Sequence, residues 1–171
     1  DLNITSSANG QNFGPVMNGD AIVLDDGNHD FGGDVSITTD FNASGTTAGA
    51  PSISQTGDWV VPGVTRLTAA NNGTVTANLG GNDFNRVDVV GGDTDLFDPN
   101  AISIGGSDIN GDFNLEANGP INDTAGAIQV SGLTDVDAGG GNDVIWDTAH
   151  DFNQIQIANV DNVSLGDQNN L

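Results

Sequence analysis

The sequence predicts an all-β fold, a parallel β-helix of stacked coils that forms one domain over residues 1–171. Asp-Phe-Asn followed by apolar–polar–apolar residues occurs at 83–89 and again at 151–157, an offset of 68 (151 − 83). Short alternating runs are bounded by Gly, Asn and Asp clusters, which tolerate turn conformations. Only 5% of the residues are aromatic, which suits coils that each bury few large side chains.

The repeat extends beyond this core motif. Gly63-Val64-Thr65 corresponds to Gly132-Leu133-Thr134 at a nearly equal offset, and a weaker copy begins at Asn28. A unit of this length with about six short strands divides into about three coils of roughly 22 to 23 residues. We therefore expect repeat units at about 52–120 and 121–171, after an excursion loop at about 40–51 where the pattern breaks.

Each expected strand is a short run of apolar residues alternating with polar ones, and no run shows a helical period. In order along the chain the expected strands are Leu2–Thr5, Ala21–Leu24, Val35–Thr38, Ser52–Ser54, Trp59–Val61, Thr65–Ala69, Thr74–Leu79, Arg86–Val90, Ala101–Ile104, Phe113–Glu116, Ile128–Val130, Thr134–Asp137, Val144–Trp146, Gln154–Ile157 and Asn162–Leu165. Hairpins would use the same turn residues, so an antiparallel β-sandwich and a Ca²⁺-binding β-roll are the alternatives. The long repeat favours stacked parallel coils. In such coils we expect Phe84 and Phe152 to occupy equivalent positions, and the side chains of Val87, Val89, Ile155 and Ile157 to point inward.

The charge of the chain is extreme. Asp and Glu number 24 against 2 Lys and Arg, which gives a net charge of −22, and the two cations are Arg66 and Arg86. Nucleic-acid binding through phosphates is excluded as a function class by this charge. No apolar run approaches the ~20 residues that span a membrane, so we expect no membrane insertion. Bound Ca²⁺ or salt would relieve the self-repulsion of the carboxylates.

Two segments carry candidate Ca²⁺ ligands. Asp93, Asp95 and Asp98 form an Asp-x-Asp-x-x-Asp cluster that we expect in one loop. Hard carboxylate oxygens at this spacing suit Ca²⁺, although a solvated turn would use the same residues. Residues 138–146 nearly match the Ca²⁺-binding nonapeptide of β-rolls, with Asp143 as its carboxylate ligand. The alternative is an ordinary β-helix turn.

No catalytic constellation is predicted. His29 and His150 occupy equivalent places in the repeat, where the middle copy has Asn82, so we expect a structural role in a turn. Polysaccharide enzymes with a parallel β-helix are the rival class, and paired Asp residues could supply acid–base chemistry there. Such enzymes commonly use Lys or Arg to hold an anionic sugar, and this chain has few. We expect that the protein is not an enzyme.

The cadence of residues 101–121 and 133–167 resembles that of a known family. It follows Ala101-Ile102-Ser103-Ile104-Gly105 and Leu133-Thr134-Asp135-Val136-Asp137, and ends at Val163-Ser164-Leu165-Gly166-Asp167. These stretches resemble the stalk repeats of filamentous-haemagglutinin-like exoproteins, which two-partner systems of Gram-negative bacteria secrete. The resemblance covers residues 52–171 and part of 1–39, and it implies a right-handed β-helix at the cell surface.

The expected function is therefore a structural module of an extracellular surface fibre or adhesin stalk. Neither end of the sequence carries a polar cap, so we expect self-assembly by end-to-end strand stacking. Candidate Asn-x-Ser/Thr acceptors make glycans further candidate partners. The alternative function is a Ca²⁺-binding RTX-like or surface-layer module.

Overall fold

The computed structural model describes the backbone of five short strands within residues 1–39, and residues 52–55, 57–124 and 126–169. The predicted excursion loop at 40–51 lies outside the described residues. The five strands are β1 (Leu2–Thr5), β2 (Met17–Gly19), β3 (Ile22–Asp25), β4 (His29–Asp30) and β5 (Val35–Thr39). From residue 52 onward the structure also describes side chains, and the account of the core and the sites concerns that part.

Twelve further strands follow, with one three-residue 3₁₀ turn at Ala70–Asn72. They are β6 (Ile53–Gln55), β7 (Trp59–Thr68), β8 (Val75–Ala77), β9 (Asp83–Gly91), β10 (Thr94–Asp98), β11 (Ile102–Ile104), β12 (Ser107–Ile109), β13 (Phe113–Ala117), β14 (Ile121–Asp123), β15 (Ile128–Asp137), β16 (Val144–Ala158) and β17 (Val163–Asp167). No helix of the described residues is long and apolar enough to cross a membrane.

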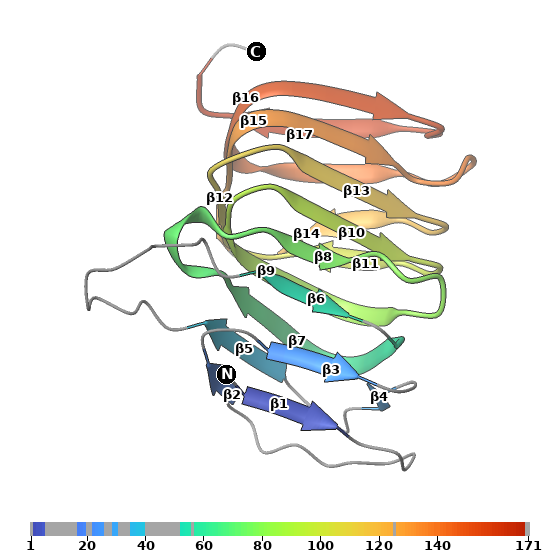
Figure 1. The fold of residues 1–171 in the computed structure, drawn as a ribbon. Helices are drawn as coiled ribbons and strands as arrows, with labels where there is room; N and C mark the ends of the chain where they lie inside the picture. The colour runs from blue at the N-terminus through green and yellow to red at the C-terminus, as the bar shows by residue number, and fades with distance from the viewer. Residues whose placement is uncertain are drawn as a thin grey trace.

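The strands stack coil upon coil, as Figure 1 shows. One ladder runs through Ile53, Val75, Thr94, Phe113, Thr134 and Ile155, so these residues mark five turns. Every strand pair recorded in the described residues is parallel, which confirms the β-solenoid and rules out the antiparallel sandwich. The position numbers along this ladder rise by 19 to 22 at each turn, so the turns are slightly shorter than predicted.

Two more columns complete the wall of the solenoid. One passes through Val87, Ile104, Asp123, Trp146 and Leu165, whose strands follow one another in register. The other passes through Gly91, Ile109, Val130 and Phe152. From β10 onward each turn therefore contributes three strand segments, and the wall has three sides.

The core forms because alternate residues of every strand point inward. β13 shows this pattern, since Phe113, Leu115 and Ala117 are buried while Asn114 and Glu116 lie outside. Aromatic side chains stack along the axis: Trp146 lies 5.6 Å from Phe152 and 6.5 Å from Phe113, measured between ring centroids. Each such buried side chain contributes about 1.5–3 kcal/mol of burial free energy.

The predicted strands are largely present, with longer bounds. β7 joins the expected runs 59–61 and 65–69 through Pro62, and β16 joins 144–146 with 154–157. After residue 52, three strands fall where none was predicted. The segment of β10 was expected to be a loop, because two of its three inward residues, Thr94 and Asp98, are polar. β12 and β14 are the three-residue segments Ser107–Ile109 and Ile121–Asp123. Such short pieces carry only one or two inward residues, which is too little alternation to recognise in a sequence.

Candidate functional site

The structure does not bring the predicted metal ligands Asp93, Asp95 and Asp98 together in one loop. Asp95 and Asp98 belong to strand β10, where Asp95 lies on the outer face and Asp98 is buried on the inner face. Asp93 precedes the strand, and its Oδ1 accepts a hydrogen bond from the N–H of Asp112 in the next coil. The prediction of a shared loop was wrong, because strand alternation separates residues that are three apart.

Asp98 is a buried carboxyl held by the backbone. Its Oδ2 accepts the N–H of Phe84 at 2.6 Å and its Oδ1 accepts the N–H of Asn100 at 2.7 Å. Burial raises its pKa from the ordinary 3.8 to about 6, and the negative charge of Asp83 adds to the rise. The two backbone hydrogen bonds favour the charged form and partly offset the rise.

The near-nonapeptide at residues 138–146 forms a turn of the solenoid between β15 and β16. Gly139, Gly140 and Gly141 all have φ between +72° and +74°, a conformation that glycine adopts without strain. Asp143 Oδ1 accepts hydrogen bonds from the N–H and the side-chain amide of Asn162, at 3.1 and 2.9 Å. Among the described residues no group of three or more His, Asp or Glu is arranged to hold a metal ion.

Asparagine side-chain amides donate hydrogen bonds to several Asp carboxylates of adjacent coils. The side-chain amides of Asn78 and Asn114 donate to the two oxygens of Asp95, one from the coil on each side. The same contact between adjacent coils joins Asn159 to Asp137, Asn162 to Asp143 and Asn169 to Asp151. Hydrogen bonds to a charged acceptor are the stronger class, so these amides stabilise carboxylates that have no cationic partner.

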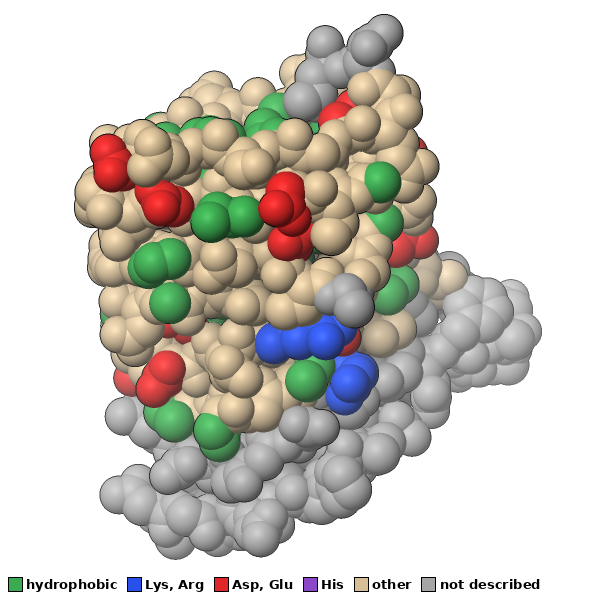
Figure 2. Space-filling view, turned by 180° about the vertical axis from the view of Figure 1, so that it is seen from behind, with side chains coloured by type: hydrophobic (Ala, Val, Ile, Leu, Met, Phe, Trp, Pro, Cys, Tyr) green, Lys and Arg blue, Asp and Glu red, His purple; other side chains and the backbone are tan. Residues whose placement is uncertain are grey.

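The two arginines of the chain lie side by side on one face (Figure 2). Arg86 binds Asp88 through both Nε and a terminal nitrogen, at 2.7 and 3.1 Å, and Arg66 Nε lies 3.7 Å from the same carboxylate. A Cβ added to Gly105 in the next coil would overlap both the Arg86 guanidinium and the Asp88 carboxylate. The absence of a side chain at Gly105 therefore leaves the space that the Arg86–Asp88 ion pair occupies.

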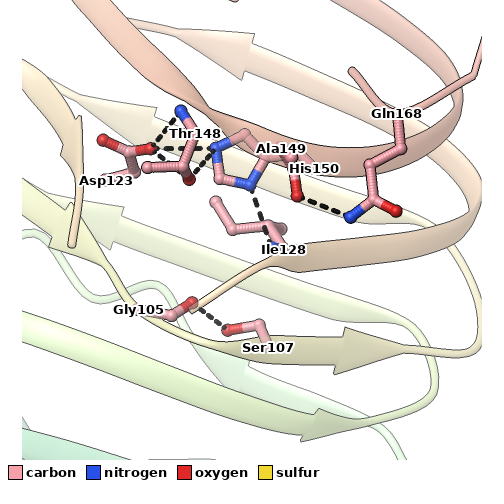
Figure 3. Close-up of polar contacts among 8 residues, drawn as sticks. All are labelled: Gly105, Ser107, Asp123, Ile128, Thr148, Ala149, His150 and Gln168. Atoms are coloured by element: carbon pink, nitrogen blue, oxygen red, sulfur yellow. Dashed lines mark hydrogen bonds and ion pairs between the residues drawn. The ribbon is translucent and has the colours of Figure 1, made fainter. Parts of the chain in front are cut away.

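A buried polar cluster surrounds His150, at the corner that joins β14, β15 and β16 (Figure 3). The His150 ring is fully buried, and its Nδ1 accepts the N–H of Ile128 at 3.0 Å. That bond places the ring hydrogen on Nε2, which lies 3.0 Å from Asp123 Oδ2. The same oxygen accepts the N–H and the Oγ1–H of Thr148, at 3.1 and 2.7 Å.

The pKa of Asp123 is set by opposing effects. Burial alone would raise this pKa, but the hydrogen bonds from the Thr148 hydroxyl and backbone N–H and from His150 outweigh it. The pKa of Asp123 therefore lies below its ordinary value, and the carboxylate remains ionised at neutral pH. Both ring nitrogens of His150 are engaged inside the fold, so the cluster orients a corner of the backbone.

A second corner has the same construction with neutral groups. Asn82 Oδ1 accepts the N–H of Trp59 at 3.0 Å, as His150 Nδ1 accepts that of Ile128. The partner of Asn82 is Gln55, which exchanges two amide hydrogen bonds with it at 2.7 and 2.8 Å. Each pair is separated by 27 residues, 55 to 82 and 123 to 150.

A polar groove crosses the outer wall of three successive coils. It has a volume of about 590 Å³ and is lined by residues of β12, β15 and β16 and by Asn169. The sequence did not predict this groove, because it depends on which coils lie side by side.

A family model described as "Repeats of unknown function (DUF5649)" matches residues 37–90 and 91–159, together 123 of the 171 residues. The chain belongs to this repeat family. No curated protein matches the DUF5649 chain. No solved structure matches it either.

The DUF5649 unit at 91–159 is close in length to the period seen in the sequence. This period is not a whole number of turns. The column that contains Phe152 runs back through Val130 and Ile109 to Gly91, three turns earlier, and the position number changes by 61 (152 − 91). Phe84 lies seven residues before Gly91 and therefore stands in another column, so the predicted positional equivalence of Phe84 and Phe152 was wrong.

Local chemistry nevertheless repeats between these sites. Both phenylalanines are buried, and the N–H of Phe152 donates to Asp167 Oδ1 as that of Phe84 donates to Asp98 Oδ2. The inward positions of Val87 and Val89 are confirmed, whereas Ile155 and Ile157 are only partly buried in the last coils. The same hydrogen-bonded corners thus recur in each sequence repeat, but they lie at different angular positions around the solenoid axis.

Proposed function

We propose that this chain is a structural rod module of a secreted bacterial surface fibre or adhesin stalk, and that modules join end to end. The observation that carries the proposal is the contrast between the last coil and those beneath it. Val144 is fully buried, but Val163, its neighbour in the same column one coil later, is 46% exposed. A stacked solenoid buries inward side chains only where a further coil covers them.

The last coil offers what a further coil needs. Within the described strands β17 pairs with β16 alone, so its other edge presents backbone N–H and C=O groups. Ile155, Ile157 and Leu165 pack on the core while remaining partly exposed. Strand addition by another copy would pair that edge and bury these side chains together.

The wall is suited to a supporting role. Backbone hydrogen bonds run along the axis between coils, and one continuous core joins the coils whose side chains the structure describes, from Ile53 onward. The resemblance of the repeat cadence to exoprotein stalks supports a place outside the cell. A net charge of −22 opposes stacking, so assembly is expected to require salt or Ca²⁺, which screens or bridges carboxylates.

Sedimentation velocity and negative-stain imaging across NaCl and CaCl₂ series at matched ionic strength test the proposal. We expect short rods that lengthen with added salt, and an effect of Ca²⁺ beyond that of NaCl if carboxylates bind the ion. Val163→Arg should prevent the lengthening by placing a charge at the open end. The control Ile145→Arg changes a residue of similar exposure, 38%, on the side wall. A sharp monomer under every condition, or equal loss in both variants, would refute end-to-end assembly.

A further inference from the structure

The groove on the side wall is lined mainly by exposed polar side chains. Asp151 in this lining already accepts a hydrogen bond from the side-chain amide of Asn169, whereas the other polar side chains of the lining have no such partner within the described residues. Asp108, Gln129 and Asp151 stand in one column through the three coils. Asn110, Ser131 and Asn153 lie two residues further along the chain in each coil, and all three are exposed.

Most carboxylates elsewhere in the described chain are held by an amide or a backbone N–H, as Asp95, Asp112 and Asp137 are. In the groove, by contrast, no hydrogen bond within the described residues engages the side chains of Asp108 or Gln129. The side chains of Asn110, Ser131 and Asn153 are likewise exposed and without such a bond. These groups are therefore available to a ligand.

The chemistry of the lining selects among ligand classes. Asp108 and Asp151 lie two coils apart, roughly 10 Å at the usual strand spacing, which is too far for one divalent ion to bind both. Amides and a hydroxyl predominate, and they both donate and accept hydrogen bonds, as sugar hydroxyls do. The net charge of −22 repels an acidic polysaccharide.

We propose that this groove binds a neutral oligosaccharide that lies along the rod axis, with about one sugar ring for each coil. The coils repeat at ~4.8 Å, close to the advance of each ring in an extended glycan chain. The apolar lining residues Ile109, Val130 and Phe152 are only 1–3% exposed, so no aromatic face is open for stacking. Recognition then rests on hydrogen bonds exchanged with water, and we expect a dissociation constant of roughly 1 mM.

This inference concerns the side wall and does not depend on end-to-end assembly. The test is titration of the ¹⁵N-labelled full chain with maltotriose, cellotriose and tri-N-acetylchitotriose, each up to roughly 10 mM, above the expected dissociation constant. We expect at least one of them to shift amide signals in β12, in the first residues of β15 and at 151–153 of β16. Trigalacturonate and spermine, titrated in parallel, distinguish acidic sugars and polycations from neutral sugars.

A matched pair of variants gives the decisive comparison. Gln129→Ala removes the central amide of the groove, whereas Gln156→Ala removes an amide on another wall that is also exposed. The first should weaken binding by about fivefold or more, and the second should leave it unchanged. No shifts with any of the three neutral trisaccharides, shifts outside the groove, binding of spermine alone, or equal weakening by both variants would each overturn the proposal.

Discussion

Asp98 should make the stability of the fold fall as the pH rises from about 4 to 7. Its side chain is fully buried, and desolvation raises its pKa from 3.8 to about 6. Between these two pH values the folded chain holds a proton at Asp98 that the unfolded chain has released. The free energy of unfolding therefore decreases as pH rises through this window, and the loss is complete above the folded pKa.

The magnitude follows from the size of the pKa change. A rise of about 2 units corresponds to about 3 kcal/mol at 1.36 kcal/mol per unit. Asn100, which binds Asp98 Oδ1, lies in an exposed turn, so solvent screening reduces the expected effect to about 2 kcal/mol. Asp98→Asn removes the titration and also loses one acceptor for a backbone N–H, a cost of about 1–3 kcal/mol that does not depend on pH.

Urea denaturation at pH 4 to 8 and constant ionic strength, followed by the fluorescence of buried Trp59 and Trp146, measures this difference. The stability advantage of the wild type over Asp98→Asn should shrink by about 2 kcal/mol from pH 4 to pH 8. Asp108→Asn removes the same formal charge from an exposed site and controls for the change in net charge. If the two pH profiles of wild type and Asp98→Asn run parallel, the burial argument for Asp98 is refuted.

Two further predictions concern packing between coils. Gly105→Ala should cost about 1 kcal/mol, because the new Cβ would displace the Arg86 guanidinium from the partly exposed Asp88 carboxylate. Gly106→Ala, whose new Cβ meets only ordinary contacts, should be nearly neutral in the same urea assay. Asp123→Gln and His150→Asn should each lower the free energy of unfolding by about 2–3 kcal/mol. The double variant should lose less than the sum of these two costs, because it creates an amide pair like that of Gln55 and Asn82. Strict additivity in that double-mutant cycle would show that the two side chains act independently.

The fold was predictable because its signals are local and recur. Alternation in runs such as Val87-Asp88-Val89 fixes which side chains face inward, and the long repeat distinguishes stacked coils from hairpins. The lengths of the turns were less predictable. The corners of a solenoid absorb extra residues without disturbing the ladder, so the turn from Ile53 to Val75 is longer than the turn from Val75 to Thr94 in the same stack.

The candidate sites were harder to predict, since they depend on contacts between coils. The Asp95 carboxylate accepts hydrogen bonds from Asn78 and Asn114, which are 17 and 19 residues away. A local sequence motif cannot predict partners at these separations. Closely spaced carboxylates can bind one Ca²⁺ only if their side chains point to the same place. Strand β10 instead places Asp95 and Asp98 on opposite faces. A prediction of faces from alternation would have separated them.

The role of His150 was anticipated only in outline. A structural role was predicted from its equivalence to Asn82, but its partners Asp123 and Thr148 were missed. The available signal was the repeat itself, because Asp123 follows Gln55 at the offset of the repeat and each is 27 residues before its partner. An amide pair replaced by an acid–imidazole pair at the same spacing indicates two side chains that bind each other.

The mismatch between repeat and turn has a consequence for the surface. Three turns separate Gly91 from Phe152 in their column, and the repeat is longer than these three turns by about seven positions, close to a third of one turn. Successive repeats therefore place equivalent corners on successive sides of a three-sided wall. The hydrogen bonds that close a corner need only the coils directly beside it, so they survive this rotation. Surface features that span several coils, such as the groove along β12, β15 and β16, need a particular side as well. Selection on the corner motif alone thus keeps the rod intact and leaves each side free to acquire its own surface.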